Sequence, residues 1–303
     1  MIKEELLSFE KITPAALGEI APFFAGKHAN ICDMSVAYLQ MWGALLRTGY
    51  AICEGLLFLR RSTRHGVFYY PPLVVGEDAD LSRGMAGLSL LAPEGKIALC
   101  ALPEGMLKAL EESFDVSDVA TSRDYADYVY HAEALATLSG KKLSKKRNLV
   151  HQFEKLYPDV AFEPLGRDHI PEAVELLRLI MAENADNRDK VYENNRVLDL
   201  LADYETLGFS GGALRVAGKL VAFCVGELID DVLYVHVEKA DRAYKGAYQY
   251  INRAFVRHML EGASFRFVNR EDDAGDEGLR QAKLSYVPAF LAYKYRAVLQ
   301  KKR

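Results

Sequence analysis

The stretch VNREDDAGDEGLRQAKLSY, residues 268–286, brings together side chains that can move protons and bind anions. Asn269, Arg270 and Glu271 lie before a predicted helix, so helix capping does not account for them. A carboxylate at Glu271 can hold an amine or remove its proton, and the guanidinium of Arg270 can hold a carboxylate or a phosphate. We therefore predict that Asn269 and Glu271 are catalytic and that Arg270 binds an anionic group.

The acids that follow favour a structural interpretation. Asp273 or Asp276 is placed to cap the predicted helix over 276–286, and Glu277 lies where it meets the positive end of the helix dipole. These residues are typical of a helix start and need no catalytic role.

A second charged segment, Lys141 to Arg147, holds five basic residues within seven positions. A backward extension of the helix predicted from Leu149 onward places Lys142 and Lys146 on its apolar face. Lysines in line with an apolar stripe either extend their ammonium groups to solvent or face an anionic ligand. We predict anion binding by Lys142, Lys146 and Arg147; a solvated run of charge is the alternative.

Helix and strand patterns alternate in a similar order in the two halves of the chain. In the first half, 50–61 and 66–75 are predicted strands, followed by a helix, the strand 95–103, a helix over 105–114 and a last strand within 124–135. In the second half, three strands within 211–240 are joined by the turns AGK and IDD. A helix, the strand 265–271, the helix 276–286 and a strand within 289–299 follow.

This order resembles the GNAT N-acyltransferase fold used twice. The resemblance implies a mixed α/β (α+β) protein of two tandem GNAT-like acyltransferase domains with mainly antiparallel sheets. We place the domains at 1–135 and 155–303, with a basic connecting helix over 136–154. The second domain is expected to carry the active cleft, and both halves are expected to have the same strand order.

GNAT enzymes bind the donor pyrophosphate at a glycine-rich turn that opens a helix, where free amides and the helix dipole attract phosphate. Arg242, Lys245, Gly246 and Ala247 in DRAYKGAYQ align with that donor phosphate loop, although its first glycine is missing. The alternative is a plain turn from strand to helix that needs one glycine.

The resemblance also implies a role for Tyr286, which lies near the position of the tyrosine that protonates the leaving group in many GNAT enzymes. Lys283, one turn earlier, can approach the same cleft and is predicted to bind an anion. A buried structural tyrosine is the alternative, since Leu279, Ala282 and Tyr286 have the spacing of a core face.

Three stretches make the resemblance more specific: 124–155, EKADRAYKGAYQYINRAF (238–255) and the stretch 268–286. Together they resemble bacterial proteins related to the C-terminal domain of phosphatidylglycerol lysyltransferases. That family is similar to the Fem-type transferases, which take amino acids from aminoacyl-tRNA. The membrane-spanning half of lipid lysyltransferases has no counterpart in this sequence.

Composition and net charge limit the possible partners and location of the protein. The net charge of −4 excludes a protein that is basic overall, so a polyanion such as tRNA must bind a local patch. No apolar run is long enough to cross a bilayer, which argues against integral membrane contact. The four cysteines are widely separated, and the histidines do not have the spacing of metal ligands. This pattern predicts a cytoplasmic protein with reduced thiols and no metal site.

We therefore predict transfer of an acyl or aminoacyl group to an amine or hydroxyl. The donor is a small molecule or aminoacyl ester, and aminoacyl-tRNA and a coenzyme A thioester are both open. Two rivals remain: an ordinary acyl-CoA N-acetyltransferase, and a non-catalytic binding protein that keeps the fold.

Overall fold

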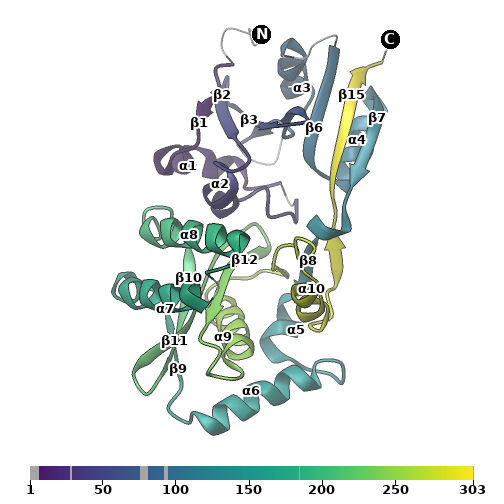
Figure 1. The fold of residues 1–303 in the computed structure, drawn as a ribbon. Helices are drawn as coiled ribbons and strands as arrows, with labels where there is room; N and C mark the ends of the chain where they lie inside the picture. The colour runs from purple at the N-terminus through teal and green to yellow at the C-terminus, as the bar shows by residue number, and fades with distance from the viewer. Residues whose placement is uncertain (1–6, 28, 76–80, 92–94, 184, 303) are drawn as a thin grey trace. The chain divides into compact units, whose positions relative to one another are not determined.

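The computed structural model describes residues 7–27, 29–75, 81–91, 95–183 and 185–302 (Figure 1). The chain forms two compact units. Unit 1 consists of Met1–Asp127, Asp272–Gly275 and Ala292–Arg303, and unit 2 consists of Tyr128–Glu271 and Asp276–Leu291. Within the described ranges, no helix has the length and apolar character that crossing a membrane requires.

Unit 1 contains an eight-stranded sheet with the order β1-β2-β3-β4-β6-β15-β7, in which β5 also pairs with β3. The recorded pairings are antiparallel except that of β4 with β6. Its strands are β1 (Glu10–Lys11), β2 (Thr48–Cys53), β3 (Leu56–Thr63), β4 (Gly66–Tyr69), β5 (Leu73–Val74), β6 (Lys96–Pro103), β7 (Phe114–Thr121) and β15 (Lys294–Lys301). Its helices are α1 (Pro14–Ile20), α2 (Val36–Trp42), α3 (Leu81–Leu90) and α4 (Glu104–Ser113), with short 3-10 turns η2 (Ala21–Phe23) and η4 (Arg123–Tyr125).

Unit 2 is built on a seven-stranded sheet with the order β14-β8-β13-β12-β11-β10-β9, in which β12 and β13 are parallel. Its strands are β8 (Asp127–His131), β9 (Ala161–Pro164), β10 (Ser210–Val216), β11 (Lys219–Ile229), β12 (Val232–Ala240), β13 (Phe267–Asn269) and β14 (Phe290–Ala292). Its helices are α5 (Ala132–Thr137), α6 (Ser144–Leu156), α7 (Ile170–Glu183), α8 (Arg188–Ala202), α9 (Ala247–Gly262) and α10 (Glu277–Leu284), with the 3-10 turn η5 (Arg167–His169).

Each half of the chain supplies the seventh strand of the other unit's sheet. The strands of each half can be numbered from 1 to 7 in chain order, with β5 left out. Both sheets then have the order 1-2-3-4-5-7-6, in which strand 7 comes from the other half of the chain. The strand in the next-to-last place is β15 in unit 1 and β8 in unit 2. The expected tandem GNAT-like fold with mainly antiparallel sheets is therefore confirmed, and so is the shared strand order.

The observed units differ from the predicted domains 1–135, 136–154 and 155–303. Strand β15, drawn in yellow in Figure 1, pairs with β6 and β7 and so completes the sheet of unit 1. Helix α6, predicted as a connector, packs against α9 in unit 2. Local sequence patterns predict that a strand forms, but they do not show which sheet it joins.

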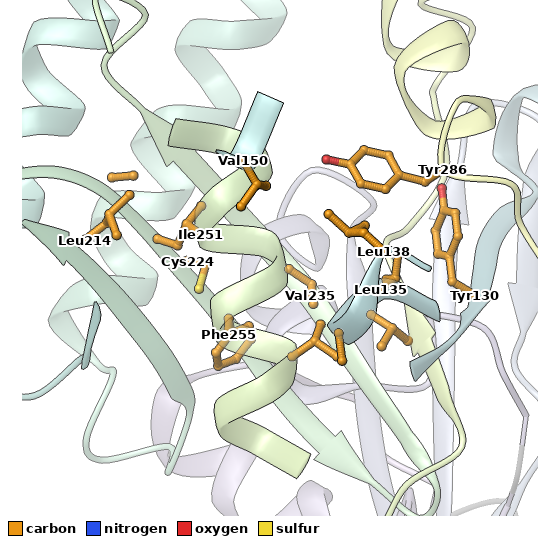
Figure 2. Close-up of a cluster of buried hydrophobic side chains, with 14 of the residues drawn as sticks. Tyr130, Leu135, Leu138, Val150, Leu214, Cys224, Val235, Ile251, Phe255 and Tyr286 are labelled. Atoms are coloured by element: carbon orange, nitrogen blue, oxygen red, sulfur yellow. The ribbon is translucent and has the colours of Figure 1, made fainter. Parts of the chain in front are cut away.

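The core of unit 2 lies between the sheet and α9, with α5 packed beside that helix. Ile251 and Phe255 of α9 are buried against Leu214 of β10 and Val235 of β12, as helical spacing of apolar residues requires (Figure 2). Tyr130 and Tyr286 belong to the same buried cluster, and Figure 2 shows them beside Leu135 and Leu138 of the α5 segment.

A buried ammonium group organises part of unit 1. Lys294, the first residue of β15, places Nζ 2.7 Å from Asp33, 2.8 Å from Asp127 and 3.3 Å from Asp272. The Cys32 thiol lies 3.2 Å from the same nitrogen. Burial alone would lower the pKa of Lys294, but the surrounding carboxylates, Asp127 first, raise it well above its ordinary value. Lys294 is therefore charged and balances part of the acidic cluster.

Replacing Lys294 with methionine should lower the free energy of unfolding by about 3–5 kcal/mol, because buried carboxylates then lose their cation. Urea unfolding measures the change. Lys301→Met, at the exposed end of the same strand, is the matched control and should change stability by less than about 0.5 kcal/mol. Equal stability of the two variants would contradict this account of the cluster.

Candidate active site

Two parallel strands of unit 2 stop pairing in the middle of the sheet. β12 pairs with β13 only as far as Tyr234 opposite Asn269. Beyond that point the chain after β13 continues alongside β8, with which β13 already pairs: Arg270 N–H donates to the Tyr128 carbonyl and Tyr128 N–H donates to the Glu271 carbonyl. In the described part of the chain, no recorded strand pairing continues on this side of β12 after Tyr234, and side chains bridge the opening between the two strands.

Arg270 and Glu238 form one bridge across this opening. Arg270 Nε donates to Glu238 Oε2 at 3.1 Å, and its Nη2 binds the same oxygen. Asn252 of α9 donates from Nδ2 to Glu238 Oε1 at 2.7 Å. The remaining guanidinium nitrogen, Nη1, is buried and makes no regular hydrogen bond among the described residues. Glu238 thus fixes the guanidinium, which also hydrogen-bonds to the Tyr286 side chain.

Two tyrosines and a lysine surround this guanidinium. The centre of the Tyr286 ring lies 4.7 Å from Arg270 Cζ and 4.4 Å from Lys146 Nζ, and Tyr130 meets the Tyr286 ring edge-on at 6.4 Å. Burial raises the pKa of Tyr286 to about 12, against the opposing charge of Arg270. Burial and the charge of Arg270 together lower the pKa of Lys146. The cluster is therefore cationic, partly desolvated and has a protonated phenol.

Glu271 and His236 form the second bridge. His236 Nδ1 lies 2.7 Å from Glu271 Oε1, and its Nε2 lies 2.9 Å from Glu227 Oε1. The imidazole is fully buried. Burial alone would lower the pKa of His236, but Glu227 and Glu271 raise it to about 9. A positively charged ring between two carboxylates results.

Backbone contacts around these bridges account for Asn269 and Lys283. The Asn269 side chain is buried and accepts the Glu271 N–H at 2.7 Å, which supports Glu271 at its left-handed φ of 56°. Lys283 is also buried and donates from Nζ to the Arg270 carbonyl at 2.6 Å. Both residues hold the chain that carries Arg270 and Glu271. Lys283 uses its ammonium for this purpose, although the sequence predicts that it binds an anionic ligand.

The predicted donor loop is a turn packed against α6. Gly246 precedes α9 with φ of 103°, and a Cβ there would lie 3.0 Å from the Leu149 carbonyl and 3.1 Å from Phe153 Cβ. Packing alone therefore requires this glycine. Arg242 and Lys245 are exposed, whereas Ala247 is buried in the core.

The basic residues of the segment 141–147 lie in different surroundings. Helix α6 begins at Ser144, so the exposed Lys142 lies outside it and does not share a helical face with Lys146. Arg147 donates from Nη1 to the carbonyls of Leu138 and Gly140 and so closes the turn after α5. Of the three predicted anion-binding residues in this run, Lys146 is the one that contacts Tyr286.

The acidic residues predicted to serve the start of α10 also have different roles. Asp276 caps α10, since its Oδ1 accepts the Leu279 N–H at 2.8 Å, and Glu277 lies in the first turn. Asp273 does not cap this helix; it is buried in unit 1, accepts the Gly275 N–H and pairs with Arg123. Of the core face expected at Leu279, Ala282 and Tyr286, only Tyr286 is buried; Leu279 and Ala282 are exposed, and Lys283 is buried instead.

Sequence reasoning missed Glu238, His236 and Tyr130, and also Asn252 and Glu227, which contact Glu238 and His236. The stretch VHVEK offered a signal for Glu238 and His236, because these two residues alternate with valines, as residues on one face of a strand do. A charge on the inner face of a buried strand requires a partner. No local pattern marked Tyr130, because it reaches the site only through the pairing of β8 with β13.

Comparison with known proteins places the chain among transferase relatives. The family model described as phosphatidylglycerol lysyltransferase, C-terminal, matches residues 24–298. The structure of a conserved protein of unknown function from Bacteroides thetaiotaomicron is 34% identical, with a TM-score of 0.85 and 96% of this chain and 99% of that chain covered.

More distant likenesses show the fold alone. L-PGS from Bacillus licheniformis has a TM-score of 0.65 at 13% identity, with 97% of this chain and 94% of that chain covered. FemX has a TM-score of 0.60 at 10% identity, with 96% and 97% covered. An uncharacterized protein of Mycoplasmoides gallisepticum is 26% identical over 195 residues. This match spans 62% of the chain and about 60% of that relative's length.

Replacing Glu238 with alanine should lower the free energy of unfolding by about 3–5 kcal/mol, because Arg270 then stays buried without its carboxylate. Chemical unfolding followed by circular dichroism measures the loss. Glu261→Ala, on the exposed end of α9, serves as the control. A Glu238→Ala protein as stable as the control would show that solvent replaces the carboxylate at no cost.

Proposed function

Because the chain belongs to the family described as phosphatidylglycerol lysyltransferase, C-terminal, we propose that it transfers an aminoacyl group from aminoacyl-tRNA to an amine or hydroxyl acceptor. The reaction takes place in unit 2, where β12 and β13 diverge. This donor implies a reaction in the cytoplasm. Transfer from an acyl-CoA to an amine is the second candidate, supported by the GNAT-like order of both sheets.

The observation that carries the proposal is the buried guanidinium of Arg270, which Glu238 fixes and which keeps one nitrogen without a regular hydrogen bond among the described residues. Attack on an aminoacyl ester forms a tetrahedral oxyanion, and a fixed donor aimed at the developing charge is the largest usual contribution to such catalysis. Arg270 Nη1 is such a donor, because Glu238 holds the other side of the guanidinium. Lys146, on the same tyrosine ring, adds a second positive charge.

The neighbouring residues supply the proton transfers. Glu271 holds the attacking amine or hydroxyl and accepts its proton, with the turn at Asn269 fixing its backbone. Tyr286 keeps its proton at neutral pH, since its pKa is about 12. It is therefore able to protonate the departing oxygen of the ribose.

The donor loop favours an ester donor over coenzyme A. A pyrophosphate site of the GNAT type needs several free amides beside closely approaching glycines. Gly246 is explained by its packing against Leu149 and Phe153, and the loop has no second glycine. The exposed basic residues Arg242, Lys245 and Lys142 instead suit the phosphates of a tRNA acceptor stem.

A transfer assay tests the reaction. Bulk tRNA charged with labelled amino acids is incubated with the protein and either phosphatidylglycerol vesicles or a peptide with a free amino terminus. Label should move to an acceptor, and Arg270→Met should lower turnover by about 10²–10³-fold, the usual loss of an oxyanion donor. Arg266→Met, at an exposed arginine four residues earlier, should keep full turnover.

Loss of folding has to be separated from loss of chemistry. The double variant Glu238→Leu/Arg270→Met removes the whole ion pair and leaves no unpaired buried charge, so it should fold and stay inactive. Acetylation of the peptide by acetyl-CoA, without transfer from any charged tRNA, would replace the proposal with the second candidate. Full activity of the double variant would exclude Arg270 from the chemistry.

Binding of tRNA gives a further prediction. Lys142→Ala combined with Lys245→Ala should weaken binding of charged tRNA and lower the slope of log K against log salt by about 1 to 2, because two phosphate contacts are lost. Fluorescence anisotropy at several salt concentrations measures the slope. Lys108→Ala, at an exposed lysine of unit 1, is the control, and an unchanged slope would remove these lysines from the tRNA surface.

A further inference from the structure

We propose that His236 is a positioning residue, which as an imidazolium ion anchored by Glu227 holds the carboxylate of Glu271 toward the reacting amine or hydroxyl. This inference rests on the proposed function for the role of Glu271. The two carboxylate partners of His236 come from β11 and from the turn after β13.

The two contact distances favour a ring that carries two protons, with the Nδ1 contact to Glu271 a hydrogen bond and the Nε2 contact to Glu227 an ion pair without regular hydrogen-bond geometry. A neutral imidazole has one N–H and one acceptor nitrogen, so it can satisfy one carboxylate and must repel the other. Both ring nitrogens of His236 lie within 3 Å of a carboxylate oxygen, at 2.7 Å from Glu271 and 2.9 Å from Glu227. The side chain has no solvent exposure, so water cannot take the place of either partner.

A β-bulge directs His236 to this position. Val225 pairs with Val237 and Gly226 pairs with Val235, so His236 is the extra residue of β12. Such a bulge re-aims a side chain and is common beside active sites. Gly226 permits the bulge, because a Cβ there would lie 2.3 Å from the Tyr234 carbonyl. The Tyr234 ring stacks on the imidazole at 6.1 Å with an angle of 6°, which limits rotation of the ring.

The Glu271 side chain and backbone are thus held from separate directions. Its N–H binds Asn269, its carbonyl binds Tyr128 N–H, and one carboxylate oxygen binds His236. The side chain keeps 20% of its exposure, so Oε2 remains for a substrate group. The imidazolium cancels one of two negative charges, and the array of Glu227, His236 and Glu271 keeps a net charge of −1, which favours an amine.

Linkage gives the pH dependence. Because the pKa of His236 is about 9 in the folded protein and near 6.5 when unfolded, its contribution to stability is complete below about pH 6.5. It is lost as the pH rises through about 9. The charged groups that face the ring are Glu227 on β11 and Glu271 after β13, and Tyr234 covers one of its faces.

Nitrogen NMR of the ¹⁵N-histidine-labelled protein tests the contact without any assay of transfer. The His236 signals are assigned by their absence from His236→Gln. Both ring nitrogens should remain protonated at pH 7.5 and titrate near pH 9, and Glu227→Gln or Glu271→Gln should each lower that titration by a unit or more. A neutral ring at pH 7.5, or a titration that neither variant moves, would overturn the proposal.

Kinetics on charged bulk tRNA then test positioning. Glu227→Gln should move the alkaline limb of the kcat profile down with the NMR titration, while KM stays within about twofold. His236→Gln should lower kcat by about 10–100-fold, and His151→Gln, at an exposed position of α6, should not. If the alkaline limb of the kcat profile stays in place while the NMR titration shifts, His236 has only a structural role. If no charged tRNA supports transfer, the proposed function fails, and the NMR result alone decides whether His236 holds Glu271.

Discussion

The parting of β12 from β13 after Tyr234 and Asn269 is the constraint on which the candidate site depends. A central strand that loses its neighbour leaves backbone groups and a buried opening that must be filled. Here two ion pairs fill it, Arg270 with Glu238 and Glu271 with His236. Charges that bridge diverging strands are fixed by both of them, so the gap in the sheet itself provides rigid, partly desolvated polar groups.

Burial of these charges is costly, and the cost explains their arrangement. Arg270 and His236 each have a carboxylate within ion-pair distance, and Glu238 gains a further hydrogen bond from Asn252. A buried pair of this kind adds little to stability compared with apolar residues of the same volume. Among the described residues, Nη1 of Arg270 has no regular hydrogen bond, and the Tyr286 side chain is a further partner of this guanidinium.

The sequence was informative where local rules decide the structure. Turn residues and alternation predicted the three strands within 211–240, and the rule for helix starts identified Asp276 as a cap. Long-range pairing set the rest. That Lys294 meets Asp33 and Asp127 depends on which sheet β15 joins. The apolar spacing on α10 misled because Lys283 reaches the Arg270 carbonyl instead.

Because each half of the chain gives its seventh strand to the other sheet, both halves contribute residues to the candidate site. The second half was expected to carry the active cleft, and two residues of the candidate site, Tyr130 on β8 and Lys146 on α6, precede residue 155. Tyr130 stands edge-on to Tyr286, and Lys146 shares the Tyr286 ring with Arg270. The cationic cluster therefore forms only when β8 pairs with β13. A fragment that starts at residue 155 retains Arg270 and Glu238 but lacks the residues that enclose and polarise them.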